Sequence, residues 1–150
     1  MKNSMKYSVI LMNEQEVLKK IERLSNDKAF GILTRNALEE KINTLNYFSC
    51  LFIDFCNMSK LNRKLGYTKV NEIIKEMFKT IPYDYKELII GRWFSGDEIL
   101  IIVDDPKDFE SCFREHVRNF GLKYKYLIID YVEDINDIEI QININHLKRY

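Results

Sequence analysis

The stretch ELIIGRWFSGDEILIIVDD, residues 87–105, contains two short apolar runs around a polar centre. The runs cover residues 88–90 and 99–103, and a serine, a glycine and two acids lie between them. Two apolar runs around a polar, glycine-containing turn predict a β-hairpin. Acids at the tip of a buried hairpin are costly unless a cation balances them, so we expect a divalent metal ion near Asp97 and Glu98.

A second unusual aspartate lies upstream, where the apolar run FSCLFIDF, residues 48–55, reaches Asp54 near its end. This run predicts a buried strand. If the strand neighbours the hairpin, Asp54 and Asp97 converge on shared divalent cations. Enzymes use that arrangement for in-line phosphoryl transfer.

The composition limits the class of protein. A chain of 150 residues is long enough for one domain with a proper core. With 23 basic and 23 acidic residues the formal net charge is zero, so we expect no direct binding to nucleic acid. The three cysteines form no CxxC pair, and no stretch has the length of a membrane span or a signal peptide. We therefore expect a soluble, reduced, cytoplasmic protein with no membrane partner.

The order of segments predicts the fold class. Apolar residues repeat with helical spacing in residues 13–24, 34–46, 57–66, 68–79 and 109–120. Asn13 and Asp108 are the expected N-caps of the first and last of these helices, and Gly66 and Gly121 are expected helix ends. Strands are expected at residues 48–55, in both hairpin arms and at residues 125–132. The sequence predicts an α+β fold, in which a β-α-β-β-α-β core forms an antiparallel sheet covered by helices on one face.

The two ends of the chain are less regular. Residues 7–12 are expected to form a short strand or an arm, and we treat residues 1–26 as a strand and helix extension. The leading helix is expected to pack on the core or on another copy of the chain. In the tail, Ile138, Ile140, Ile142 and Ile144 alternate with polar residues, and this period of two favours a strand.

Three motifs in the right order resemble the GGDEF domain, the palm-like fold of diguanylate cyclases, over about residues 27–130. The segment DKAFGILTR, residues 27–35, keeps the Asp, Gly and Arg of the family's D-x-L-T-G-L-x-N-R motif. Asp54, Asn62 and Gly66 match the family's next motif, D-x-D-x-F-K-x-x-N-D-x-x-G-H-x-x-G-D. The segment SGDEI, residues 95–99, lies at the position of the family's G-G-D-E-F signature. The resemblance implies a ferredoxin-like palm domain over residues 27–150, whose central hairpin carries the SGDE turn.

The resemblance also implies metal-binding and catalytic roles. Asp54 and Asp97 would hold two Mg²⁺ or Mn²⁺ ions, with the Phe55 carbonyl as a further ligand. Glu98 would complete the metal shell or help to deprotonate the attacking 3′-hydroxyl, and both roles stay open. Small residues at the turn, Ser95 and Gly96, would let the backbone approach the triphosphate.

Nucleotide recognition is implied at other positions, with departures from the family pattern. Asn62 and Asn71 would face the base. Ser59 occupies the position of a phosphate-contacting Lys, so Lys60 would substitute only through a shift of one residue. Further departures are Cys56 for a second Asp, Tyr67 for a His and Val70 for a Gly.

Asn71 is the most informative departure, because a guanine-selective cyclase carries Asp there. A carboxylate accepts the two N–H donors of guanine, whereas an amide matches the donor and acceptor of adenine. Asn71 therefore weakens the case for GTP and opens one for ATP. In this respect the chain also resembles the minimal CRISPR polymerases, a group with the same palm fold. These proteins look like makers of cyclic oligoadenylate-type signals in anti-phage defence.

The sequence thus predicts an enzyme that condenses two molecules of ATP or GTP into a cyclic dinucleotide and releases pyrophosphate. One site holds one nucleotide, so catalysis would need a homodimer. The alternative is a degenerate palm that senses a nucleotide or cyclic dinucleotide without chemistry. A purely structural domain is a third possibility.

Overall fold

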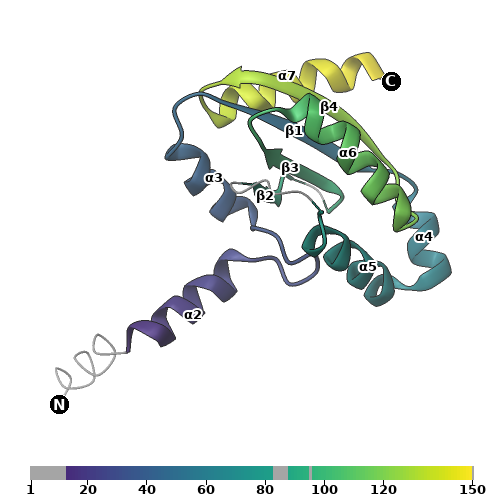
Figure 1. Ribbon diagram of the computed structural model, residues 1–150, viewed down its shortest axis with the longest axis horizontal. Helices are drawn as coiled ribbons and strands as arrows, with labels where there is room; N and C mark the ends of the chain where they lie inside the picture. The colour runs from purple at the N-terminus through teal and green to yellow at the C-terminus, as the bar shows by residue number, and fades with distance from the viewer. Residues whose placement is uncertain (1–12, 83–87, 95, 150) are drawn as a thin grey trace.

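A four-stranded antiparallel sheet lies at the centre of the chain (Figure 1). The computed structural model describes residues 13–82, 88–94 and 96–149. The strands are β1 (Phe48–Phe55), β2 (Ile89–Arg92), β3 (Glu98–Ile102) and β4 (Tyr124–Val132), in the order β2-β3-β1-β4. The predicted hairpin and the β-α-β-β-α-β core are confirmed. The strand expected at residues 7–12 lies outside the described residues.

The described part of the chain contains six helices. They are α2 (Glu14–Ser25), α3 (Arg35–Asn43), α4 (Met58–Leu65), α5 (Tyr67–Lys79), α6 (Pro106–Asn119) and α7 (Ile135–Arg149). None of the helices in the described residues is long and apolar enough to cross a membrane.

Helices cover both faces of the sheet, so the expectation of one covered face was wrong. On β1, Leu51 and Ile53 pack toward α5 and α6, whereas Cys50 and Phe52 pack toward α3 and α7. All four of these β1 side chains are buried. Residues 50–53 of β1 are apolar without alternation, so this stretch buries both of its faces and needs a layer of helices on each side.

The tail is a helix, α7, and the predicted strand was wrong. Ile138 and Ile142, four residues apart, are buried in the core, whereas Ile140 is 56% exposed and Ile144 is 45% exposed. The Asp134 side chain accepts a hydrogen bond from the Asp137 amide at 3.0 Å, so it caps the helix. The alternating pattern placed isoleucines on two sides of a helix, only one of which packs on the sheet.

Two other helix expectations have different outcomes. Asp105, rather than Asp108, caps α6, because its side chain accepts a hydrogen bond from the Asp108 amide at 3.2 Å and Pro106 occupies the first turn. The leading helix is confirmed as α2, and the Asn13 side chain accepts from the Gln15 amide at 2.8 Å. Its apolar residues Val17 and Ile21 are exposed, and α2 projects away from the sheet (Figure 1).

Candidate nucleotide and metal site

Asp54 and Glu98 lie directly opposite each other across β1 and β3. They form the last of five consecutive register pairs between the two strands, and the first pair is Cys50 with Ile102. Because side chains alternate between the faces of a sheet, two residues that pair in register point to the same face. Like charges at such positions are destabilising. On its other side Asp54 pairs with Lys125 of β4, so the row across the sheet contains two acids and one base.

Asp97 lies one position closer to the turn. The Phe55 amide donates a hydrogen bond to the Asp97 carbonyl at 3.1 Å, which places Asp97 opposite Phe55. Burial raises the pKa of the Asp97 carboxyl, Arg92 opposes the rise, and the Glu98 charge adds to it. The structure thus brings the carboxylates of Asp54, Asp97 and Glu98 to the same end of the β1–β3 pair.

Arg92 connects the turn to the loop at residues 27–33. Its Nη1 donates a hydrogen bond to the Gly96 carbonyl, and its Nε lies 3.5 Å from Asp27 Oδ2. The guanidinium carbon lies 3.8 Å from the centre of the Phe30 ring. Asp27 Oδ2 also accepts from the Phe30 amide at 2.8 Å, so the carboxylate fixes its own loop as well as Arg92. The sequence reasoning missed Arg92, because its role depends on a partner 65 positions away in the chain.

Arg35 supports the turn from the other face of the sheet. Its guanidinium carbon lies 4.0 Å from the centre of the Trp93 ring and 4.1 Å from that of Phe94. Its nitrogens bind Glu39 at 2.8 Å and Glu139 of α7 at 3.1 Å. Trp93 is buried, whereas Phe94 is 69% exposed.

A cavity of about 350 Å³ lies beside these aromatic residues. Trp93, Phe94 and Glu98 line it from the hairpin, and Glu139 and Asn143 line it from α7. The cavity adjoins Glu98, which lies on the same face of the sheet as Asp54. The role of α7 in this site was not foreseen, because the tail was predicted as a strand.

Asn62 and Asn71, the predicted base-facing residues, are half-buried on α4 and α5. These helices meet at Gly66, whose φ of +86° lies in the region that favours glycine and whose amide donates to the Asn62 carbonyl at 2.8 Å. The Asn62 Oδ1 atom is buried and has no hydrogen-bond partner in the described part of the chain. A buried acceptor in this state needs a donor from a ligand or water. Lys60 is exposed on α4; Ser95 lies outside the described residues.

The oxygen donors at this end of the sheet are of the chemical kind that Mg²⁺ takes. Among the described residues, no group of three or more His, Cys, Asp or Glu side chains is arranged to hold a metal ion by itself. Mg²⁺ is commonly held by one or two carboxylates together with substrate phosphates. Asp54 and Glu98 supply two such carboxylates on one face of the sheet, and Asp97 and the Phe55 carbonyl lie at the next register position. The Asp54–Glu98 pair supplies negative charge for a cation to balance.

Comparison with known proteins identifies the fold. No family model matches the sequence, and neither does any curated protein. Several solved structures match. A microbial GGDEF domain studied with cyclic di-GMP has a TM-score of 0.60 at 16% identity, over 77% of this chain and 83% of that domain. The diguanylate cyclase SiaD of Pseudomonas aeruginosa, solved with its activator SiaC, gives 0.63 at 14% identity, over 95% of this chain.

The coiled coil and GGDEF domain of DgcB from Caulobacter crescentus, in complex with c-di-GMP, gives a TM-score of 0.61 at 9% identity. That match covers 85% of this chain and 80% of the DgcB chain, whereas this chain spans 65% of the SiaD chain. The chain therefore has the GGDEF-like palm fold, which confirms the fold that the three sequence motifs implied.

Proposed function

We propose that the protein is a metal-dependent nucleotidyltransferase that condenses two nucleoside triphosphates into a cyclic dinucleotide. The observation that carries the proposal is the gathering of three carboxylates at one end of β1 and β3, with Asp54 directly opposite Glu98. The palm fold shared with diguanylate cyclases supports it. One chain offers one such site, so two copies would face each other during the reaction.

The proposed roles follow from the positions of the residues. Asp54, Asp97 and the Phe55 carbonyl would hold Mg²⁺ or Mn²⁺, and the metal would neutralise charge on the triphosphate. The 3′-oxygen of one nucleotide forms a bond to the α-phosphorus of the other, and the bond from that phosphorus to the bridging oxygen breaks, so pyrophosphate leaves. The 3′-oxygen of the second nucleotide then attacks the α-phosphorus of the first in the same way, which closes the ring and releases a second pyrophosphate. Glu98 would accept the proton of the 3′-hydroxyl. Gly96, held by Arg92, would keep the turn open to the phosphates.

We favour ATP as the substrate. The buried Asn62 Oδ1 atom, which has no partner among the described residues, can accept a hydrogen bond from the amino group of either purine, so the preference depends on Asn71. The Asn71 amide can donate to a ring nitrogen and accept from an amino group, whereas a carboxylate at that position would suit guanine. Cyclic di-AMP would be the simplest product, and a GTP-derived product is the alternative outcome.

The direct test is to incubate the pure protein with Mn²⁺ or Mg²⁺ and each of the four triphosphates, and to identify products by mass spectrometry. We expect a cyclic dinucleotide from the wild type. Asp54→Ala and Asp97→Ala should each lower its formation by about 100-fold or more, a typical loss for a group that stabilises developing charge. Asp104→Ala, which removes an exposed acid beyond the end of β3, is the matched control. Undiminished turnover in either site variant would overturn the metal assignment.

A nucleotide sensor without chemistry is the second candidate. It is favoured by Ser59 and Val70 in α4 and α5, where the resembled family has Lys and Gly; Val70 is fully buried and Ser59 is exposed. A sensor would show nucleotide-dependent thermal stabilisation and form no product with any triphosphate or metal. Product formation would exclude it.

A further inference from the structure

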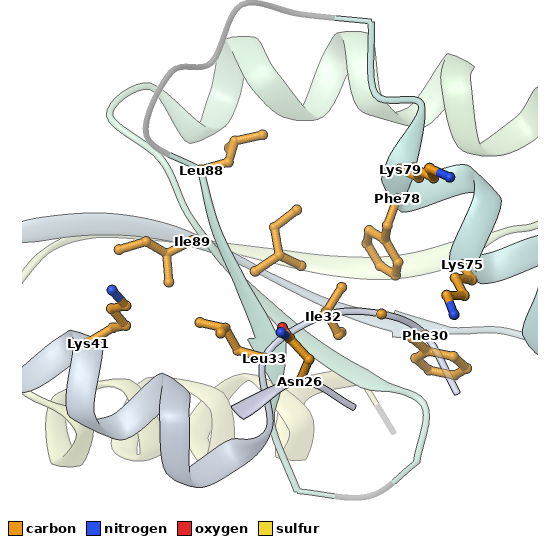
Figure 2. A pocket seen from close by; sticks show the side chains of 12 residues that line it. Asn26, Phe30, Ile32, Leu33, Lys41, Lys75, Phe78, Lys79, Leu88 and Ile89 are labelled. Carbon is orange, nitrogen blue, oxygen red and sulfur yellow. The ribbon is translucent and has the colours of Figure 1, made fainter. Parts of the chain in front are cut away.

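A second and larger cavity, of about 470 Å³, lies at the outer edge of β2, between α3 and α5 (Figure 2). Its volume falls within the range of about 300–1,000 Å³ that is usual for small-molecule sites. Its lining is mainly apolar and includes Phe30, Phe78 and Leu88. Neither Asp54, Asp97 nor Glu98 contributes to it, so it is distinct from the proposed catalytic end of the sheet.

Three lysines surround this apolar lining. Lys41 reaches it from α3, and Lys75 and Lys79 reach it from α5 on the opposite side (Figure 2). Among the residues that the structure describes, the lining contains no Asp or Glu. None of the three ammonium groups has an ion-pair partner within the residues that the structure describes. Because the whole chain has a formal net charge of zero, this positive charge is a local property of the cavity.

The backbone makes room for one of these lysines. Gly31 has a φ of +71°, which favours glycine, and a Cβ atom added there would lie 3.3 Å from both Cγ and Cε of Lys75. The aliphatic stem of Lys75 therefore lies directly against the Gly31 backbone in the wall of the cavity. Such a stem adds apolar surface while its ammonium group stays available to an anion.

We propose that this cavity binds a small organic phosphate that carries an apolar or aromatic group. The apolar lining would hold the body of the ligand, and the lysines on the two sides would hold the phosphate. An uncharged apolar molecule would leave the lysines without a partner, and inorganic phosphate would leave the apolar lining empty. The proposal concerns binding alone and does not depend on the proposed nucleotidyl transfer.

The experiment compares three probes: 1-naphthyl phosphate, which has both the aromatic group and the phosphate, 1-naphthol, which has only the aromatic group, and inorganic phosphate. Each is titrated into the full ¹⁵N-labelled chain, and the amide shifts of Gly31, Leu33 and Ile90 are followed. We expect saturable shifts with 1-naphthyl phosphate and an affinity about tenfold higher than for either other probe, because both sets of contacts are then made. Lys75→Gln and Lys41→Gln should each weaken binding by about fivefold.

Lys107→Gln, which removes an exposed charge on α6 outside the cavity lining, is the matched control and should leave the affinity unchanged. Equal binding of 1-naphthol and 1-naphthyl phosphate would overturn the proposal, and so would an equal loss in Lys107→Gln. Shifts confined to Asn62, Asn71 and Asp97 would also overturn it. That last result would place the phosphate at the proposed nucleotide site and leave the proposed function intact.

Discussion

Asp27 and Arg92 form an ion pair, with Asp27 Oδ2 3.5 Å from Arg92 Nε, that joins the loop before α3 to the hairpin turn. Both side chains are 21% exposed, so the pair is partly shielded from water. The same guanidinium binds the Gly96 carbonyl and lies over Phe30. The position of the proposed catalytic turn therefore depends on a loop that precedes it by more than 60 residues.

Arg92→Ala should lower the free energy of unfolding by about 1–2 kcal/mol, because it removes a charged hydrogen bond, a cation–π contact and a partly buried ion pair. Urea unfolding followed by circular dichroism measures the change. Arg118→Ala, at an exposed position in the last turn of α6, should cost less than about 0.5 kcal/mol. Equal losses in the two variants would contradict a structural role for Arg92.

Glu98→Gln should stabilise the metal-free protein by about 0.2–1 kcal/mol, because it removes one of two like charges at a directly opposed cross-strand pair. The measurement is urea unfolding in the presence of a chelator. Glu115→Gln, which neutralises an exposed acid on α6, is the control and should change little. A Glu98→Gln variant less stable than the wild type would show that the two carboxylates do not repel each other appreciably.

The raised pKa of Asp97 predicts how stability depends on pH. Below the ordinary carboxyl pKa of about 4, Asp97 is protonated in both states, so wild type and Asp97→Asn should differ little. Between that value and the raised folded pKa, the unfolded chain loses the Asp97 proton first, so the contribution of Asp97 to stability falls as pH rises. The advantage of Asp97→Asn should therefore grow with pH and then level off.

Urea unfolding of both proteins without divalent cations, from about pH 3.5 to pH 7.5, tests this dependence. Asp104→Asn, at an exposed acid, should show a smaller change with pH relative to the wild type. A stability difference between Asp97→Asn and the wild type that stays constant over the whole range would be inconsistent with a raised Asp97 pKa.

The hairpin and β1 were predictable because their patterns are local. The apolar run of β1 reaches Asp54 near its end, and the apolar run of β3 follows directly after Asp97 and Glu98. The structure brings these three acids to one end of the sheet. That they bind metal ions stays a prediction. The contacts of Arg92 and Arg35 were not predictable from local pattern, since each joins segments distant in sequence.

The tail shows where a local pattern misleads. Strict alternation of isoleucine with polar residues has the period of a strand, yet Ile138 and Ile142 also fit a helix at i and i+4. The distinguishing signal was the cap: Asp134 and Asp137 lie three residues apart, and the Asp134 side chain accepts from the Asp137 amide at 3.0 Å. An Asp at the cap position with a second acid in the first turn is a sequence-level sign of a helix start.

Substitutions in the tail distinguish the helix from the strand. Ile138→Ala should lower the free energy of unfolding by about 2–4 kcal/mol, because the side chain is fully buried. Ile140→Ala, at a position that is 56% exposed, should cost less than about 0.5 kcal/mol. In a strand, both isoleucines would lie on one face and the two losses would be similar. Urea unfolding of the two variants therefore tests α7 directly.

Asn71→Asp should shift base preference from adenine toward guanine, because a carboxylate accepts from the two N–H groups of guanine and leaves the ring nitrogen of adenine without a donor. With equal ATP and GTP present, we expect the ratio of adenine to guanine in the product to fall by about tenfold, the equivalent of one lost hydrogen bond. Mass spectrometry of the product mixture measures that ratio. Asn119→Asp, the same chemical change at an exposed position on α6, should leave it unaltered. If Asn71→Asp and Asn119→Asp gave the same ratio, Asn71 would not contact the base, and the preference for ATP would lose its main support.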